Sequence, residues 1–116
     1  MREVTVRNSS SGLLLGDRIR IADTSLTRLF GLLNRSGLSA GEGLWIQPSS
    51  GVHTFFMRFA IDVVGLDKDL RVVKLWANLR PYRVTSIQTR LRSVIELPDG
   101  RISASGTKLG DKLSFE

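Results

Sequence analysis

Hydrophobic and polar residues alternate over several stretches of the chain, with the two-residue period of a half-buried β-strand. The alternation is clear at 2–6 and at 18–21, on either side of a turn rich in Ser and Gly. From Leu44 onward the chain is rich in β-branched and aromatic residues, and turn residues recur at short intervals. This pattern predicts a mainly β protein, a compact β-barrel or a jelly-roll-like sandwich. The further predicted strands are 44–46, 52–66, 70–76, 93–97 and 113–115.

One stretch has a helical period instead. Its apolar residues recur every three or four positions, at Leu26, Leu29, Phe30 and Leu33. Asp23 or Thr24 can cap the N-terminus, and Gly37 lies where the helix would end. The pattern predicts one short α-helix at about residues 24–34.

The best-specified unit is a β-hairpin around the turn residues 67–69. If these three residues form the loop, the register places Val63 opposite Val73 and Asp62 opposite Lys74. Buried charges are normally paired, so an ion pair with Lys74 would explain Asp62 without a functional role. A slip of one residue would break both pairings, which makes this register a testable prediction. The three loop residues could also mimic a metal-binding Asp-x-Asp motif, but they are more typical of a turn.

The length and the absence of Cys narrow the class of protein. A chain of 116 residues predicts a single domain, 1–116, that can bury a core without a structural metal. The lack of Cys excludes disulfide scaffolds, Cys-based zinc fingers, thioredoxin-like redox sites and Cys nucleophiles. The apolar run 13–15 is too short for a signal peptide or a membrane span. The expected location is the cytoplasm, with export after removal of a leader as the alternative, and the default oligomeric state is a monomer.

The formal net charge of +6 belongs to one segment. Between Leu70 and Ile95 there is no acidic residue, whereas basic and acidic residues balance in the rest of the chain. The segment could be a solvated sheet face, a contact surface for nucleic acid, or a site for a small anion. With Lys74 assigned to Asp62, the remaining candidate anion contacts of this basic patch are Arg71, Arg80, Arg83, Arg90 and Arg92.

His53 and Arg58 are the polar residues whose surroundings point most directly to chemistry. His53 is the only imidazole, so a metal site would need carboxylates such as Asp62 and Glu96 beside it. A fully extended chain would separate His53 from Asp62 by about 30 Å, so a bend would be required. A hydrogen-bonded structural role or a ligand contact are the other interpretations of His53. Arg58 lies among aromatic residues and has no assigned partner, which favours an anion-binding group.

The segment 37–41 matches the Gly-x-Ser-x-Gly nucleophile elbow. That motif needs a strand before the Ser and a helix after it, whereas here a predicted helix precedes the Ser. We therefore expect a loop and assign no catalytic residue.

The run 52–67, VHTFFMRFAIDVVGLD, resembles the central motif of the bacterial and archaeal domain of unknown function 192. Three flanking pieces are similar too: Gly31 to Leu33 with Arg35 and Leu38, then 41–46, and then 94–98 with Gly100, Gly110 and Asp111. Together they span about 22–113. The resemblance implies a compact β-barrel or jelly-roll-like sandwich with one short helix, and it implies no established activity.

Two positions depart from the pattern of that family. Ala60 and Gly65 stand where the most similar subgroup commonly has Pro and Phe. The loss of the Phe would remove a large buried or pocket-lining side chain. The family's polar positions match His53, Thr54, Arg58, Asp62 and Glu96, so any shared site is expected there.

Three functional hypotheses follow. The first is a non-enzymatic binding or accessory module with an anion-accepting site near His53 and Arg58, supported by Asp62 and Glu96. The second is a metal-dependent hydrolase that uses His53, Asp62 and Glu96. The third is nucleic-acid binding through 70–95. The sequence holds no Gly-rich phosphate loop or dinucleotide fingerprint, so no cofactor is expected.

Overall fold

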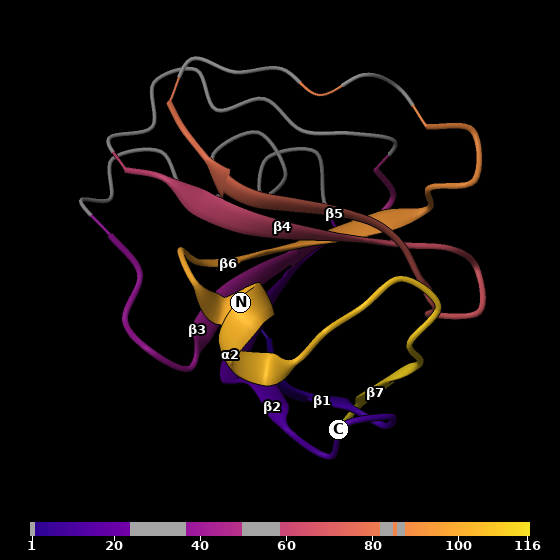
Figure 1. Ribbon diagram of the computed structural model, residues 1–116, viewed down its shortest axis with the longest axis horizontal. Helices are drawn as coiled ribbons and strands as arrows, with labels where there is room; N and C mark the ends of the chain where they lie inside the picture. The colour runs from indigo at the N-terminus through magenta and orange to yellow at the C-terminus, as the bar shows by residue number, and fades with distance from the viewer. Residues whose placement is uncertain (1, 24–36, 50–58, 82–84, 86–87) are drawn as a thin grey trace.

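The computed structural model describes residues 2–23, 37–49, 59–81, 85 and 88–116. Within these ranges, seven strands form one sheet and one short helix, α2 (Arg101–Ser105), packs against it (Figure 1). The strands are β1 (Glu3–Asn8), β2 (Leu14–Ala22), β3 (Glu42–Ile46), β4 (Ile61–Leu66), β5 (Val72–Leu79), β6 (Ser93–Pro98) and β7 (Leu113–Phe115).

The sheet has the strand order β5-β4-β6-β3-β2-β1-β7 and curls into a half-barrel (Figure 1). Its two edge strands meet at one end, where Arg71 and Lys112 form an isolated antiparallel bridge. The N–H of Val72 donates to the carbonyl of Asp111 at 2.8 Å, and the N–H of Gly110 donates back to the carbonyl of Val72 at 2.8 Å. The mainly β fold class is thereby confirmed.

The buried residues fall into two clusters on the two faces of the curled sheet. The first cluster takes residues from both ends of the strand order, such as Val72 and Leu113, together with Ile102 of α2. A cluster shared by both sheet edges lies inside the curl. The second cluster includes Leu44, Val63 and other residues of the middle strands and belongs to the outer face. Alternate residues of one strand therefore enter different cores.

Most predicted strands are present with shifted ends, and one prediction needs correction. Of the predicted strand 52–66, residues 52–58 lie outside the described ranges, Phe59 and Ala60 are not in a strand, and β4 begins only at Ile61. The predicted helix 24–34 also lies outside the described residues. The helix α2 was not predicted, because five residues with one large apolar side chain show no helical period.

The predicted hairpin forms between β4 and β5, but its predicted register is wrong. Val63 lies opposite Trp76, and Lys74 lies opposite Gly65 rather than Asp62. A β-bulge between Gly65 and Leu66 contributes to the shift. The ion pair between Asp62 and Lys74 is therefore wrong as well.

The hairpin loop explains the rest of the shift. The N–H of Asp67 donates to the carbonyl of Arg71 at 3.0 Å, so the three-residue loop is 68–70, one position later than predicted. The Asp67 carboxylate accepts the N–H groups of Asp69 at 2.8 Å and Arg71 at 3.0 Å. Leu70 then takes a left-handed conformation with φ 63°, as the last residue of such loops does. The predicted turn is thus confirmed and its side-chain bonds are structural.

Candidate functional site

The structure describes two of the five residues predicted for a shared site. His53, Thr54 and Arg58 lie outside the described residues, whereas Asp62 and Glu96 lie on the adjacent strands β4 and β6.

Asp62 is 1% exposed and its carboxylate is fully engaged with the backbone. One oxygen accepts the N–H of Asn78 at 2.9 Å, where a bulge interrupts the pairing of β4 with β5. The other accepts the N–H of Ile102 at 2.8 Å, in the first turn of α2. Asp62 lies opposite Leu97 of the inner cluster, so its side chain is on the inner face of the sheet. Its observed role is to hold the bulge and the helix in place.

Glu96 is buried on the other face. It lies opposite Leu44 on β3 and Val63 on β4, which both belong to the outer cluster. Desolvation by burial raises the pKa of Glu96 to about 7, so the carboxyl is often protonated near neutral pH.

Asp62 and Glu96 consequently do not share a site, because the sheet separates their carboxyl groups. A metal bound by both would need them within about 4 to 5 Å of each other, given metal-to-oxygen distances near 2.0 to 2.2 Å. Among the described residues no group of three or more His, Asp or Glu side chains could hold a metal ion. The described geometry therefore does not support the predicted trio with His53.

The Gly-x-Ser-x-Gly segment leads into β3. The N–H of Ser39 donates to the Glu42 carboxylate at 2.8 Å, and the N–H of Glu42 donates to the Ser39 carbonyl at 3.0 Å. A strand therefore follows this turn, where a nucleophile elbow requires a helix. The prediction of a loop is confirmed.

The described arginines of the basic patch have different surroundings. Arg71 donates to the Gly110 carbonyl at 3.2 Å, and Arg80 donates to the Asn78 side chain at 3.3 Å. Arg92 and Arg90 line two different cavities. Arg83 lies outside the described residues.

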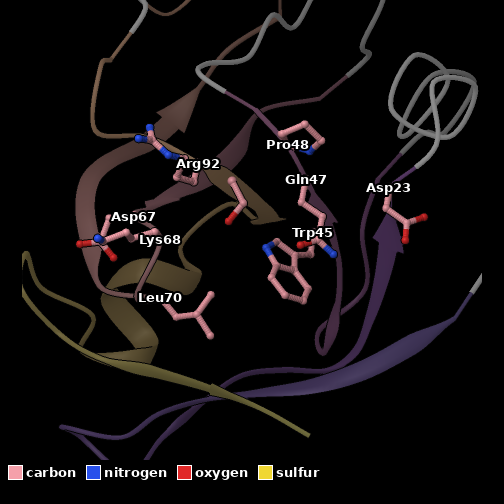
Figure 2. Close-up of a pocket in the computed structure, with 9 residues that line it drawn as sticks. Asp23, Trp45, Gln47, Pro48, Asp67, Lys68, Leu70 and Arg92 are labelled. Carbon is pink, nitrogen blue, oxygen red and sulfur yellow. The ribbon is translucent and has the colours of Figure 1, made fainter.

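The larger of these cavities, the Trp45 pocket, has a volume of about 490 Å³ (Figure 2). It is formed by the end of β3 and the residues after it, the start of β6, and the hairpin loop between β4 and β5. Its apolar walls are Trp45, Pro48 and Leu70, and its other lining residues are Asp23, Gln47, Asp67, Lys68, Arg92 and Ser93.

Trp45 contributes an unpaired hydrogen-bond donor to this pocket. Its ring stacks on Phe115 with the ring centroids 4.0 Å apart and the planes tilted by 30°. The indole Nε1 is buried and has no hydrogen-bond partner among the described residues. Figure 2 shows the nitrogen-bearing edge of the ring turned toward the space between the labelled residues. A buried donor without an acceptor destabilises a protein, so its position calls for an explanation.

The charged side chains of the pocket differ in how many hydrogen bonds they form with the described part of the protein. Burial acts to raise the pKa of Asp67, but hydrogen bonds from the Arg71 and Asp69 N–H groups and the charges of Arg90 and Lys112 outweigh it and lower the pKa. Arg92 donates through one guanidinium nitrogen to the carbonyls of Thr89 at 3.0 Å and Leu91 at 3.3 Å. Lys68 forms no hydrogen bond or ion pair with the described part of the chain.

Among the lining residues of this pocket, only Arg92 was predicted from the sequence as a candidate anion contact. Trp45 lies near the end of a short strand, and its ring packs on Phe115, 70 positions later in the chain. The local pattern around Trp45 shows a strand and carries no signal for a pocket.

Comparison with known proteins finds a family model and relatives that match nearly the whole chain. The family model DUF192, described as "Uncharacterized ACR, COG1430", matches residues 6–115. A UPF0127 protein from Pyrococcus horikoshii is 33% identical over 93% of this chain and 96% of its own length. A UPF0127 protein from Pyrococcus abyssi is 32% identical over 93% of this chain and 94% of its own length.

Two crystal structures share the fold. A protein of unknown function from Novosphingobium aromaticivorans superposes with a TM-score of 0.81 at 27% identity, over 97% of this chain and 83% of that one. A protein from Sinorhizobium meliloti superposes with a TM-score of 0.80 at 21% identity, over 97% of this chain and 92% of that one, and this likeness concerns the fold alone. No helix within the described ranges is long and apolar enough to cross a bilayer. Since the family model spans nearly the whole sequence, the chain belongs to the DUF192 family.

Proposed function

We propose that this protein is a non-enzymatic module that binds a small organic anion in the Trp45 pocket. The observation that carries the proposal is the buried indole N–H of Trp45, which has no acceptor among the described residues and borders a cavity of about 490 Å³. That volume lies within the range of small-molecule sites, which combine apolar walls with a few polar groups.

The chemistry of the lining suggests what the ligand carries. An acceptor oxygen on the ligand would take the Trp45 N–H, which otherwise costs about 1–3 kcal/mol as an unpaired buried donor. Trp45, Pro48 and Leu70 offer an apolar surface for the body of the molecule. Lys68 and the remaining guanidinium nitrogens of Arg92 are cationic donors suited to a carboxylate.

The anion-accepting site predicted near His53 and Arg58 remains a second expectation within this proposal, with Thr54 beside them. His53 follows Pro48, a lining residue of the Trp45 pocket, by five positions in the chain. The titration below therefore also follows the side-chain signals of His53 and Arg58.

The test is an NMR titration of the ¹⁵N-labelled protein with aromatic and aliphatic carboxylates, their neutral amides, and simple sugars. The chain has two Trp residues, so Trp76 is an internal control on the outer face of the sheet. We expect a carboxylate to shift the Trp45 indole N–H signal saturably and to leave the Trp76 signal in place. The proposal fails if no compound in the panel shifts the Trp45 signal.

Two variants sharpen the result. Trp45→Phe keeps a ring against Phe115 but removes the N–H donor, so it should weaken binding several-fold without unfolding the protein. Arg92→Gln should lower the affinity for the carboxylate about tenfold and leave the affinity for the matching amide unchanged. Arg20→Gln, on β2 and outside the pocket lining, is the charge-matched control and should bind like the wild type.

A further inference from the structure

A second cavity, the Lys74 cavity, has a volume of about 230 Å³ and lies against β5. Its described lining residues are Val73, Lys74, Gln88, Thr89 and Arg90. None of them lines the Trp45 pocket. The two cavities are therefore built from different residues, and nothing proposed above uses the smaller one.

The cavity is formed because a turn packs closely against the hairpin. The N–H of Leu91 donates to the Gln88 carbonyl at 3.1 Å, which closes a turn over residues 88–91. Leu91 is 3% exposed and belongs to the outer cluster. Its side chain occupies the space above Gly65, where a Cβ atom would meet Leu91 Cδ1. Gly65 thus allows the turn to approach the sheet.

The same packing brings two cations to one cavity. Lys74 lies directly opposite Gly65 in the hairpin, and Arg90 precedes Leu91 in the turn. Neither side chain forms a hydrogen bond or an ion pair with the described part of the chain. The charge of Arg90 helps to lower the pKa of Asp67, on the neighbouring hairpin loop. None of the described lining residues is acidic, so no carboxylate among them neutralises the two cations.

Size and polarity indicate the class of ligand. A volume of 230 Å³ is below the range of about 300–1,000 Å³ that holds drug-sized molecules. The cavity has one apolar lining residue, Val73, and offers an ammonium, a guanidinium and the Thr89 hydroxyl as donors. A tetrahedral oxyanion can accept from all three, and charge-assisted bonds from Lys and Arg are the strong ones.

We propose that the Lys74 cavity is a binding site for a phosphate-sized oxyanion, held by Lys74, Arg90 and Thr89. The oxyanion is either free in solution or the terminal phosphate group of a larger molecule. The site does not depend on the ligand of the Trp45 pocket.

The test is a titration with inorganic phosphate at constant ionic strength, with chloride as the balancing anion. We expect saturable shifts of the backbone signals of Lys74, Thr89 and Arg90. A chloride titration reproducing these shifts, or shifts that rise linearly without saturation, would overturn the proposal. A parallel titration with glycerol 3-phosphate distinguishes the two sources: tighter binding supports a phosphate group on a larger molecule, and equal binding supports recognition of the oxyanion itself.

Variants separate this site from other surface charges. The double variant Lys74→Gln, Arg90→Gln should lower phosphate affinity at least tenfold, and both side chains are exposed, so the fold should persist. The conservative variant Lys74→Arg should retain most of the affinity. Arg20→Gln is the charge-matched control. Unchanged affinity in the double variant would sink the proposal, and Trp45→Phe, which tests the other pocket, should leave phosphate binding intact.

Discussion

The carboxylate of Asp62 accepts the backbone N–H of Ile102 at 2.8 Å, and so ties the start of β4 to the first turn of a helix 40 positions later in the chain. The first N–H groups of a helix have no partner within the helix. The N-cap residue of α2, Gly100, has no side chain that could accept these N–H groups. Asp62 on the sheet accepts one of them, the N–H of Ile102. The same carboxylate holds the bulge of β5 through Asn78.

Asp62→Ala should therefore destabilise the fold by about 3 kcal/mol, since two N–H groups lose a charged acceptor. The measurement is urea denaturation followed by circular dichroism. Asp17→Ala is the control, because Asp17 is exposed and its ion pair with Arg18, at 3.8 Å, is worth less than about 1 kcal/mol. Equal effects of the two substitutions would contradict the role assigned to Asp62.

Glu96 should make stability fall as the pH rises. Its pKa is about 7 in the folded state because of burial, against 4.5 when exposed, so the folded state binds more protons between these values. The contribution of the neutral carboxyl is fully present below pH 4.5 and is lost as the pH rises toward and through 7. The shift corresponds to about 3 kcal/mol.

Glu96→Gln removes this titration. We expect the variant to be more stable than the wild type at pH 8, by up to about 3 kcal/mol, and the difference to vanish near pH 4. Denaturation curves at several pH values check this, with the exposed Glu3→Gln as control. A constant difference between Glu96→Gln and wild type at all pH values would contradict the raised pKa.

Gly65 and Leu91 should be energetically coupled. A methyl group at position 65 would meet Leu91 Cδ1 and come within 3.3 Å of Lys74 Cβ and 3.4 Å of the Trp76 ring. Gly65→Ala should cost about 1–3 kcal/mol through overpacking, and Leu91→Ala about 2–4 kcal/mol through the cavity it leaves. Because the two defects compensate, the double variant should be less destabilised than the sum. Simple additivity in this double-mutant cycle would rule out the packing described.

Asn8 should link the first strand to the last turn of the chain. Its buried amide donates to Asp111 at 2.9 Å and to Thr107 at 3.3 Å, and its carbonyl accepts the N–H groups of Ser10 and Ser11. Asn8→Ala should cost about 2–3 kcal/mol, because these groups lose their partner. Denaturant titration measures the change, and the neighbouring exposed Ser9→Ala is the control.

Asn8→Ala should also change how the free energy of unfolding depends on pH. The hydrogen bond from Asn8 is the main cause that lowers the pKa of Asp111, with a further bond from the Lys108 N–H. A lowered carboxyl pKa stabilises the fold above 3.8, the ordinary value, and this contribution is lost as the pH falls through the folded-state pKa. Asn8→Ala should therefore lose less additional stability than the wild type between neutral pH and pH 3. A steeper acid loss in the variant would contradict this assignment.

The positions of the strands could be predicted because alternation is a local property. The strands at 18–21 and 113–115 could each be predicted from the residues of that short segment alone. The hairpin between β4 and β5 was predicted from its turn residues, but its register was not. That register depends on the side chain of Asp67, on the left-handed Leu70 and on the bulge after Gly65, which single-residue preferences do not reveal.

The candidate site was less predictable, because it also depends on contacts between residues far apart in the chain. Asp62 and Glu96 were both predicted to belong to one site, yet they lie on opposite faces of the sheet. Asp62 pairs with Leu97 of the inner cluster, whereas Glu96 pairs with Val63 of the outer cluster. The ring of Trp45 packs on Phe115, and the turn that lines the Lys74 cavity packs on the hairpin through Leu91 and Gly65. Each of these contacts joins residues far apart in the chain.

The sequence by itself determined that the chain builds a β domain of the DUF192 type, with its excess positive charge in 70–95. Only the tertiary structure decided which face of the sheet Asp62 and Glu96 occupy and which cavities the arginines of that segment border. Arg92 borders the Trp45 pocket and Arg90 the Lys74 cavity, although they are two positions apart. The physical reason is that side-chain period and hydrophobicity are local, whereas strand register, bulges and the closure of the half-barrel depend on distant partners.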